Sequence, residues 1–252
     1  YENEDVLILN KPSGILSQKA VASDYSLNEQ IVEYYKWKGG SLSLFTPSVC
    51  NRLDRNTSGI ILAGMSLKGT QMLSRVLKAR TIDKYYLTIV CGTVTQATTI
   101  KGFLCKKKNH NQVVIFRTKE EALANGYQEA AFIETQYKPL AHGKSGKENF
   151  TLLKVKLVTG KTHQIRAHLK SVGHPIIGDG KYGLKSVNAY IKSAFGIRHQ
   201  LLHAFYIHFP EDIDNVLAGK SFTAMPEEPF LQAIYAMFDS IQTKEDLEEK
   251  ML

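Results

Sequence analysis

The sequence predicts an α+β fold, with a mixed, largely antiparallel β-sheet core flanked by helices and loops. Patterns typical of β-strands follow one another through the middle of the chain, and patterns typical of amphipathic helices lie on either side. Runs of neighbouring strands favour antiparallel pairing, whereas a doubly wound parallel sheet would need strands and helices to alternate. With 252 residues, 43% of them hydrophobic, the chain can bury a substantial core.

Helices are predicted where apolar residues recur every three or four positions. The expected helices cover residues 27–37, 67–77, 163–173 and 228–241. Ser26 or Asp24 can cap the first of them and Ser66 the second, while Gly173 can end the third. From about residue 241 to residue 252 the chain is polar, and we expect a frayed tail there.

Strands are predicted where aromatic and β-branched residues cluster or alternate with polar ones. The expected strands cover residues 5–9, 60–63, 84–92, 113–116, 131–137, 150–158 and 201–209. The alternation is cleanest at Leu153, Val155 and Leu157. The turn NKPSG after the first strand combines Pro12 with Gly14, which tolerates a positive φ.

Composition restricts the class of protein. Cys50, Cys91 and Cys105 are an odd number and form no close pair, so we expect neither a disulfide framework nor a zinc site, and a reducing cytoplasm as the compartment. No apolar run approaches the roughly 18 residues that span a bilayer. The net charge of +8 and the pI of about 9.2 are equally typical of a protein with a polyanionic partner and of one whose charge serves solubility alone.

The segment NRLDRNTSG (51–59) carries the first candidate site. Asp54 lies between Arg52 and Arg55, and flanking cations favour the ionised carboxylate that a nucleophile or base requires. The small residues Thr57 and Ser58 would let the backbone approach a ligand closely. Taken alone, the spacing of these residues favours a surface loop with ordinary ion pairs, in which Asp54 would contribute little.

The segment TGKTHQIRAHL (159–169) gathers several basic side chains, including His163 and Arg166. It can be a phosphate-binding helix start or a solvated basic helix. A nucleotide-binding P-loop would need a glycine at position 155, which is valine. Zinc is not expected, because His163 and His168 are five residues apart with no acidic ligand between them.

Two further segments are ambiguous when they are considered alone. In KYYLTIVCG (84–92) the neighbours Tyr85 and Tyr86 point to opposite faces of a strand, so one can be core while the other faces a pocket. The glycine-rich HPIIGDGKYG (174–183) carries Asp179, and it can contact phosphate or serve as a tight connection.

Together, these segments resemble the RluA-type family of RNA pseudouridine synthases. The family pattern HRLDRxTSG, K-x-Y, TGxTHQIRxHL and GHPIxGDxxYG appears here in order as NRLDRNTSG, Lys84-Tyr85-Tyr86, TGKTHQIRAHL and GHPIIGDGKYG. DVLILNKPSGILS and LLHA also match, so the resemblance covers about residues 3 to 230. One position departs from the pattern, because Asn51 stands where the family usually has histidine.

The resemblance implies a pseudouridine synthase fold with an active-site cleft across the sheet. It implies a single catalytic domain over residues 1–252, with the family's S4-like RNA-binding domain absent or upstream of Tyr1. It also implies a cytoplasmic, commonly monomeric enzyme that binds RNA, either ribosomal or transfer RNA, and needs no nucleotide cofactor and no metal.

The resemblance assigns a role to individual residues. Asp54 matches the catalytic aspartate, Arg166 the arginine that pairs with it, and Tyr86 the tyrosine that packs against the target base and can assist proton removal from C5. RNA or substrate contacts are expected from Arg52, Arg55, Thr57, Ser58, Lys84, His163, Gln164, Leu169 and His174.

The expected function is isomerisation of specific uridines to pseudouridine in structured RNA, with 23S ribosomal RNA favoured over transfer RNA. The enzyme would flip the uridine out of its stack and use the Asp54 carboxylate. Two other classes are weighed against it. A non-catalytic RNA-binding module would need the positive charge but not Asp54 together with Arg166. A hydrolase with two carboxylates would need a partner for Asp54, and the acidic residue that follows it in the sequence is Asp83.

Overall fold

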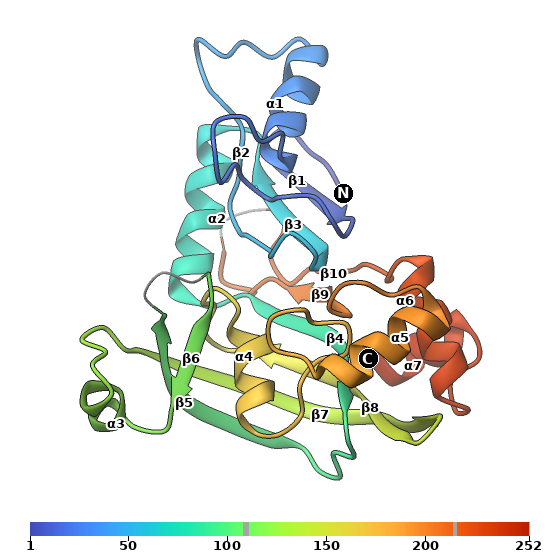
Figure 1. The fold of residues 1–252 in the computed structure, drawn as a ribbon. Coiled ribbons are helices and arrows are strands. Elements are labelled where there is room, and N and C mark those ends of the chain that lie inside the picture. The colour runs from blue at the N-terminus through green and yellow to red at the C-terminus, as the bar shows by residue number, and fades with distance from the viewer. Residues whose placement is uncertain (108–110, 214–215, 252) are drawn as a thin grey trace. The chain divides into compact units, whose positions relative to one another are not determined.

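A computed structural model describes residues 1–107, 111–213 and 216–251 (Figure 1). The residues group into two units by their contacts. Unit 1 consists of Tyr1–Asp83 and Ala204–Met225, and unit 2 of Lys84–His203 and Pro226–Leu252. In the described ranges, no helix is long and apolar enough to cross a membrane.

Unit 1 is built around β3 (Ser58–Gly64), which pairs antiparallel with both β1 (Val6–Lys11) and β2 (Ser48–Val49). Strand β9 (Leu202–His208) is the next strand beyond β3, and β10 (Ser221–Thr223) pairs antiparallel with β9. The core contains residues of β1, β3, β9 and α2, and it includes Val6, Ile8, Ile60, Leu62, Met72, Leu73, Val76, Ile207 and Phe209.

The helices of unit 1 begin where their caps predict. Helix α1 (Leu27–Trp37) starts after Ser26, which forms a reciprocal capping box with Glu29. Helix α2 (Leu67–Ala79) starts after Ser66, whose hydroxyl accepts the N–H of Gly69 at 3.0 Å. It extends two residues beyond the predicted end at Leu77, as far as its cap Arg80 in left-handed conformation.

Unit 2 contains an antiparallel sheet in the order β4 (Asp83–Cys91), β8 (Glu148–Leu157), β7 (Ala131–Ser145), β5 (Thr98–Lys106) and β6 (Val113–Phe116). Each of these neighbours pairs antiparallel, and β7 and β8 form a long hairpin (Figure 1). The predicted fold class, an α+β protein with a largely antiparallel sheet, is confirmed.

Several helices of unit 2 differ from the prediction. Helices α3 (Lys119–Ala124) and α5 (Lys185–Phe195) were not expected, and α6 (Glu228–Met237) ends four residues early. The tail is not frayed, because residues 244–251 form α7 (Lys244–Met251) with Leu247 and Met251 buried. Two apolar residues four positions apart suffice for a helix when the rest of the fold covers them, which local polarity does not reveal.

Candidate active site

In unit 1, Asp54 lies on a tight turn between β2 and β3 and is half-buried. The main-chain carbonyl of Asp54 accepts the N–H of Thr57 at 3.0 Å, which closes the turn. Just before it, the buried hydroxyl of Ser17 accepts the N–H of Leu53 at 3.0 Å and donates to the Leu53 carbonyl at 2.9 Å. The backbone on both sides of Asp54 is therefore held by hydrogen bonds, which fixes the point at which its side chain leaves the main chain.

Lys11 stabilises this turn through hydrogen bonds to main-chain carbonyls, and it was not among the predicted site residues. Its side chain is 1% exposed, and its ammonium donates to the carbonyl oxygens of Pro12, Ile15 and Arg55 at 2.7, 2.9 and 3.1 Å. A buried charge is costly unless hydrogen bonds surround it, and three carbonyls do so here. Lys11 thus ties the NKPSG turn to the segment that carries Asp54. The lysine within the motif-matching start of the chain was the signal that could have identified it.

Asn51 has a clear structural place. Its side-chain oxygen accepts the N–H of Leu62 at 2.7 Å, and its amide nitrogen donates to the carbonyl of Ile60 at 3.3 Å. Both partners are main-chain groups of β3, so Asn51 extends the hydrogen bonding along that strand. The departure from the family pattern therefore falls on a side chain that anchors the start of the motif to the sheet.

The remaining predicted residues of unit 1 differ in exposure. Arg52 and Arg55 are exposed, and the Arg55 guanidinium lies 4.0 Å from the carboxylate of Asp24. Thr57 and Ser58 are buried. Of these four residues, the two arginines are accessible to a large ligand and the two hydroxyl residues are not.

Gly59 ends the motif at a place where no side chain fits. Its φ is +110°, and a Cβ added there would lie 2.3 Å from the carbonyl oxygen of Ala204 on β9. We expect Gly59→Ala to lower the free energy of unfolding by about 2–4 kcal/mol, because backbone strain adds to a main-chain clash. Urea denaturation followed by circular dichroism measures this.

Gly180→Ala is the control for this prediction. An added Cβ at Gly180 meets nothing within 4 Å, so the substitution should change the free energy of unfolding by no more than about 0.5 kcal/mol. Equal stability of the two variants would show that the close approach of Gly59 to Ala204 is not a constraint.

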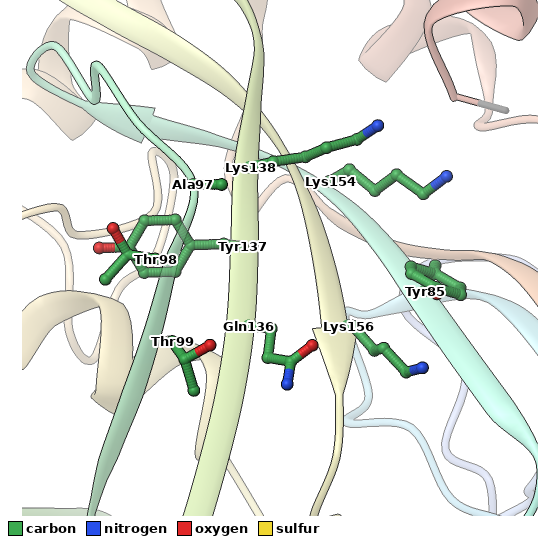
Figure 2. Close-up of a pocket in the computed structure, with 9 residues that line it drawn as sticks. All are labelled: Tyr85, Ala97, Thr98, Thr99, Gln136, Tyr137, Lys138, Lys154 and Lys156. Atoms are coloured by element: carbon green, nitrogen blue, oxygen red, sulfur yellow. The ribbon is translucent and has the colours of Figure 1, made fainter.

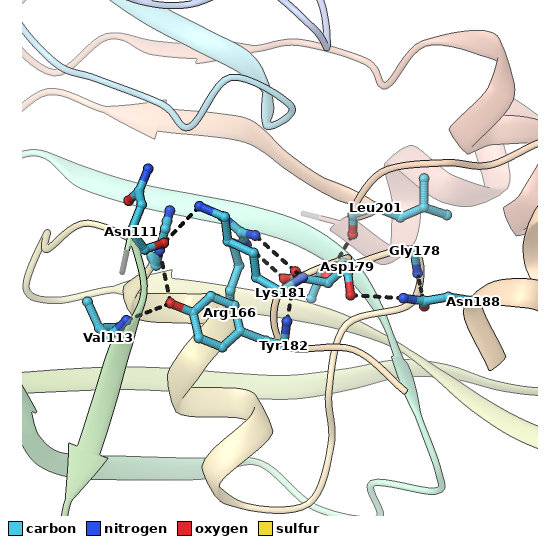
Figure 3. Close-up of polar contacts among 11 residues, drawn as sticks. Asn111, Val113, Arg166, Gly178, Asp179, Lys181, Tyr182, Asn188 and Leu201 are labelled. Carbon is cyan, nitrogen blue, oxygen red and sulfur yellow. Dashed lines mark hydrogen bonds and ion pairs between the residues drawn. The ribbon is translucent and has the colours of Figure 1, made fainter. Parts of the chain in front are cut away.

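In unit 2, Arg166 lies on helix α4 (Gln164–Ser171) and is 4% exposed. Its Nε donates to Oδ2 of Asp179 at 2.7 Å and its Nη2 to Oδ1 at 2.9 Å, a bidentate pair shown in Figure 3. The guanidinium carbon also lies 5.2 Å from the centre of the Tyr182 ring. Arg166 is therefore held in one orientation by its own unit.

Asp179 is held as firmly as the arginine it binds. Its Oδ1 also accepts the N–H groups of Lys181 and Tyr182 at 2.8 and 3.1 Å (Figure 3). Burial would raise the pKa of this carboxyl, but the hydrogen bonds and charge of Arg166, together with the two N–H groups, hold the pKa below its ordinary value. Of the two readings of the HPIIGDGKYG segment, the structure supports a tight connection whose carboxylate binds Arg166.

The alternative of a solvated basic helix is wrong, because residues 164–169 of α4 are all buried. The Gln164 amide is fully used: its oxygen accepts from Thr159 and Lys161, and its nitrogen donates to Glu134 and Thr135. This gives Gln164 a structural place, and its expected RNA contact stays a prediction.

His163, predicted as an RNA contact, caps α4 in the left-handed conformation with a φ of 58°. It is buried, and its Nδ1 lies 2.9 Å from the hydroxyl of Tyr182. That hydroxyl also accepts the N–H of Val113 at 2.8 Å, so Tyr182 links strand β6 to His163. The imidazole thereby joins the loop around Asp179 to helix α4.

His168 points into the fold and gives the protein a predicted acid sensitivity. It is 1% exposed, and burial lowers its pKa to about 4 although a hydrogen bond to the backbone of Lys101 opposes the shift. In the unfolded state the imidazole of His168 takes up a proton near pH 6.5, whereas in the folded state it stays neutral down to about pH 4. The free energy of unfolding therefore keeps its full value, as far as His168 determines it, above pH 6.5. It should fall by about 3 kcal/mol between pH 6.5 and pH 4.

Urea denaturation at several pH values measures this loss, and His168→Gln should flatten the slope in that window. His199→Gln, at an exposed histidine, should keep the wild-type slope. Asp179 titrates below this window, since its pKa is lowered from an ordinary value of 3.8. Equal slopes in wild type and His168→Gln would contradict the prediction.

Tyr86 and the remaining predicted residues of unit 2 differ in how deeply they are buried. Tyr86 lies on β4 opposite Val155 of β8 and is 7% exposed, whereas its neighbour Tyr85 is half-buried. Leu169 is fully buried. Of the remaining two, Lys84 is half-buried, and Nδ1 of the half-buried His174 lies 3.1 Å from the carbonyl oxygen of Cys91.

The predicted residues thus divide between the units. Asp54 and its flanking arginines belong to unit 1, and Tyr86 and Arg166 belong to unit 2. The expected pairing of Asp54 with Arg166 joins the two units and stays a prediction. Among residues 1–107, 111–213 and 216–251, no group of three or more metal-ligating side chains is placed to hold a metal ion.

Comparison with known proteins gives a consistent result. The sequence model of a family described as RNA pseudouridylate synthase matches residues 5–171. An uncharacterized RNA pseudouridine synthase of Mycoplasma genitalium is 29% identical over 84% of this chain and 62% of its own length. Ribosomal large subunit pseudouridine synthase C of Pasteurella multocida is 34% identical over 83% of this chain and 59% of its own length. This chain therefore spans about three fifths of the length of these two relatives.

A third relative and two solved structures extend the comparison. The tRNA pseudouridine synthase C of Yersinia pestis is 27% identical over 94% of this chain and 89% of its own length. Human RNA pseudouridylate synthase domain containing 1 has a TM-score of 0.70 at 23% identity and covers 100% of this chain and 92% of its own. The human domain containing 4 has a TM-score of 0.71 at 18% identity, over 93% and 90%. At these identities the solved structures show a shared fold.

Proposed function

Because this chain belongs to the RNA pseudouridylate synthase family, we propose that it isomerises uridine to pseudouridine in structured RNA, with Asp54 as its catalytic carboxylate. The observation that carries the proposal is that the family match over residues 5–171 contains Asp54, Tyr86 and Arg166, each in its own family motif. The hydrogen-bonded turn at Asp54 supports it further, because a nucleophile must be held in position.

The reaction makes clear demands on the protein. The N1–C1′ bond of the uridine breaks, the detached uracil turns, and C5 bonds to C1′. The C5 hydrogen then leaves as a proton and N1 takes up a proton, so the product is an isomer of the substrate. The Asp54 carboxylate can attack C1′, promote elimination across C1′–C2′, or add to C6 of the base. In each route the detached base must stay in a closed site from which water is excluded.

Arg166 is suited to act as the partner of the Asp54 carboxylate. Asp179 engages one edge of its guanidinium, through Nε and Nη2, and Nη1 lies on the other edge. An arginine can bind two carboxylates in this way, and the second would be Asp54. Asp179 would then fix the orientation of Arg166, and Arg166 would fix that of Asp54.

The other residues would bind the nucleotide. Tyr86 would pack against the flipped uracil and assist removal of the C5 proton, with Leu169 as an apolar contact. The exposed Arg52 and Arg55 would bind phosphates of the flipped nucleotide or of the strand it leaves. The recovered contacts offset the few kcal/mol that unstacking costs. We expect a monomer that works in the cytoplasm and needs no nucleotide cofactor.

The substrate we propose is 23S ribosomal RNA, with transfer RNA as the alternative. The relative named as a ribosomal large subunit enzyme is 34% identical to this chain, and the relative named as a tRNA enzyme is 27% identical. Each RNA, labelled with tritium at uridine C5, should be incubated with the protein, since forming the C5–C1′ bond releases the label into water. Release from ribosomal RNA alone is expected, release from transfer RNA alone would reverse the assignment, and release from neither would contradict the activity.

A further inference from the structure

Ser17 is a buried residue of unit 1 whose hydroxyl binds the main chain just before Asp54. It is 3% exposed. Its hydroxyl accepts the N–H of Leu53 at 3.0 Å and donates to the carbonyl of Leu53 at 2.9 Å. One side chain therefore satisfies both main-chain polar groups of the residue that precedes the proposed catalytic carboxylate. Ser17 is not among the residues to which the proposed mechanism assigns a role.

The hydrogen bond to the Leu53 carbonyl constrains Asp54 itself. That carbonyl belongs to the peptide bond that joins Leu53 to Asp54, and a peptide bond is planar, so the plane that contains the Asp54 nitrogen is held as well. On the other side, the Asp54 carbonyl accepts the N–H of Thr57 at 3.0 Å, which holds the next plane. With both planes held, the direction in which the Cα–Cβ bond of Asp54 points is constrained. A shift of either plane would move the carboxylate with it.

Ser17 is in turn held by the start of helix α1. Its carbonyl accepts the N–H of Asn28 at 3.2 Å, and the carbonyl of Leu16 accepts the N–H of Leu27 at 2.8 Å. These are N–H groups of the first helical turn, which no carbonyl of the helix itself can accept. The side-chain oxygen of Asn28 also accepts the N–H of Val49 on β2 at 3.0 Å. Ser17 is therefore supported by regular secondary structure, as a residue that fixes a nucleophile needs to be.

Other contacts hold the turn at a peptide bond beyond Asp54. The Lys11 ammonium and the N–H of Gly14 both donate to the carbonyl of Arg55, at 3.1 and 3.0 Å. Neither contact involves the hydroxyl of Ser17, so both should persist when that hydroxyl is removed. The turn should then still form, and the change should be concentrated at the peptide bond that leads into Asp54.

We propose that Ser17 is a positioning residue for pseudouridine formation, which holds the peptide plane before Asp54 so that the carboxylate meets the uridine in a reactive geometry. The inference rests on the proposed function, in which Asp54 is the reacting group. Because Ser17 is buried and acts through Asp54, its loss should affect turnover much more than RNA binding. A misplacement of about 1 Å at a reacting group can cost about 10²-fold in rate.

Two substitutions at Ser17 separate its hydrogen bonds from its packing. Ser17→Ala removes the hydroxyl and leaves its space empty. Ser17→Cys fills that space with sulfur, which is a weak donor and a weak acceptor. If hydrogen bonding to Leu53 is what matters, both variants should lose activity. Ser17→Cys also carries the test if Ser17→Ala does not fold, which urea denaturation establishes beforehand.

Ser66→Ala is the matched control within unit 1. The half-buried hydroxyl of Ser66 also has hydrogen bonds on both sides, since it accepts the N–H of Gly69 and donates to the carboxylate of Asp5. It follows the far end of β3, a strand of seven residues, and so lies roughly 20 Å along the chain direction from the start of that strand. Thr99→Ala is the control in unit 2, where it removes an exposed hydroxyl from the wall of the hollow shown in Figure 2.

Turnover is measured as tritium release from C5-labelled ribosomal RNA, per folded enzyme and over a range of RNA concentrations. Ser17→Ala should lower kcat by about 10- to 100-fold while KM stays within about twofold of wild type. Ser17→Cys should lower kcat by at least about fivefold. Ser66→Ala and Thr99→Ala should keep kcat within about twofold of wild type.

Hydrogen exchange provides a second measurement that does not depend on activity. In the free protein, the amides of the peptide that spans residues 51–57 should exchange faster in Ser17→Ala and Ser17→Cys than in wild type, because the N–H of Leu53 loses its acceptor. The two controls should exchange there at the wild-type rate. Mass spectrometry of the digested protein follows this peptide.

Two results would overturn the inference. One is a kcat for Ser17→Ala within about twofold of that for Ser66→Ala, which would leave Ser17 with a structural role alone. The other is a wild-type kcat for Ser17→Cys, which would show that the space is needed and the hydrogen bonds are not.

The same measurements separate the inference from the proposed function. If wild type releases tritium and Ser17→Ala matches its control, the inference fails and the function stands. If wild type never releases tritium, the proposed function fails and the role of Ser17 in the reaction fails with it. Faster exchange at residues 51–57 in Ser17→Ala would then still show that the hydroxyl holds the backbone before Asp54.

Discussion

Asp54→Asn should reduce the rate of pseudouridine formation by at least about 10⁴-fold, as expected when the nucleophile of an enzyme is removed. The amide has nearly the shape of the carboxylate, but it lacks the charge and the nucleophilic oxygen. The turn should persist, because Thr57 donates to the main-chain carbonyl of Asp54, which the substitution leaves in place. Single-turnover assays with excess enzyme and C5-tritiated RNA measure the rate without a contribution from product release.

Asp239→Asn is the control for this substitution, at an exposed aspartate outside the family motifs. It should release tritium at the wild-type rate. Asp54→Asn should still bind RNA, since it loses no cation. A variant that binds RNA normally and turns it over at more than about a tenth of the wild-type rate would remove Asp54 from the chemistry.

Asp179→Asn should lower both stability and the catalytic rate constant, because Arg166 would keep its buried charge but lose the bidentate carboxylate. Breaking a buried pair by removing one partner costs about 3–5 kcal/mol. Loss of orientation at Arg166 should also lower kcat by about 10²-fold, with KM nearly unchanged, because Arg166 is proposed to act on the nucleophile. Both constants are measured per folded enzyme, below the unfolding temperature of the variant.

Leu247→Ala separates positioning from general stability. Leu247 is fully buried in α7 of unit 2, and its truncation should cost a similar 2–5 kcal/mol. If Asp179→Asn does not fold, Asp179→Glu keeps the charge while displacing the carboxylate by one methylene. It should lose kcat with a smaller loss of stability. Equal kcat per folded enzyme in Leu247→Ala and either Asp179 variant would leave Asp179 with a structural role alone.

The sequence predicted those parts of the fold that local physics decides. Helices α1 and α2 begin after Ser26 and Ser66, because hydroxyl caps satisfy N–H groups within their own first turn. The opposite orientations of Tyr85 and Tyr86 follow from the two-residue period of a strand. These features need no knowledge of distant parts of the chain.

Features that depend on tertiary contacts were not predicted. Helix α7 forms on a polar segment because Leu247 and Met251 are covered by the rest of unit 2. Asp179 lies thirteen positions from Arg166 in a glycine-rich loop, and nothing in that loop alone selects an arginine over a phosphate as its partner. Lys11 likewise appears as an ordinary surface lysine until the carbonyls around it are known.

The role of the family motifs was accessible from sequence only when they were taken together. Taken alone, the residues around Asp54 fit a surface loop better than a catalytic one. The order of four motifs identified the family, and the structure then supplied the contacts that hold Asp54 and Arg166 within their own units. Their pairing depends on the placement of the two units, which explains why it stays a prediction.

Nucleoside analysis of the RNA product tests the central claim most directly. Ribosomal RNA is incubated with wild-type protein and digested to nucleosides, which are separated and quantified together with any free base in solution. The account predicts that pseudouridine appears in an amount equal to the uridine lost, with no free uracil, and that Asp54→Asn yields neither change. Free uracil in place of pseudouridine would identify a hydrolase, and pseudouridine formed at the wild-type rate by Asp54→Asn would contradict the role of that carboxylate.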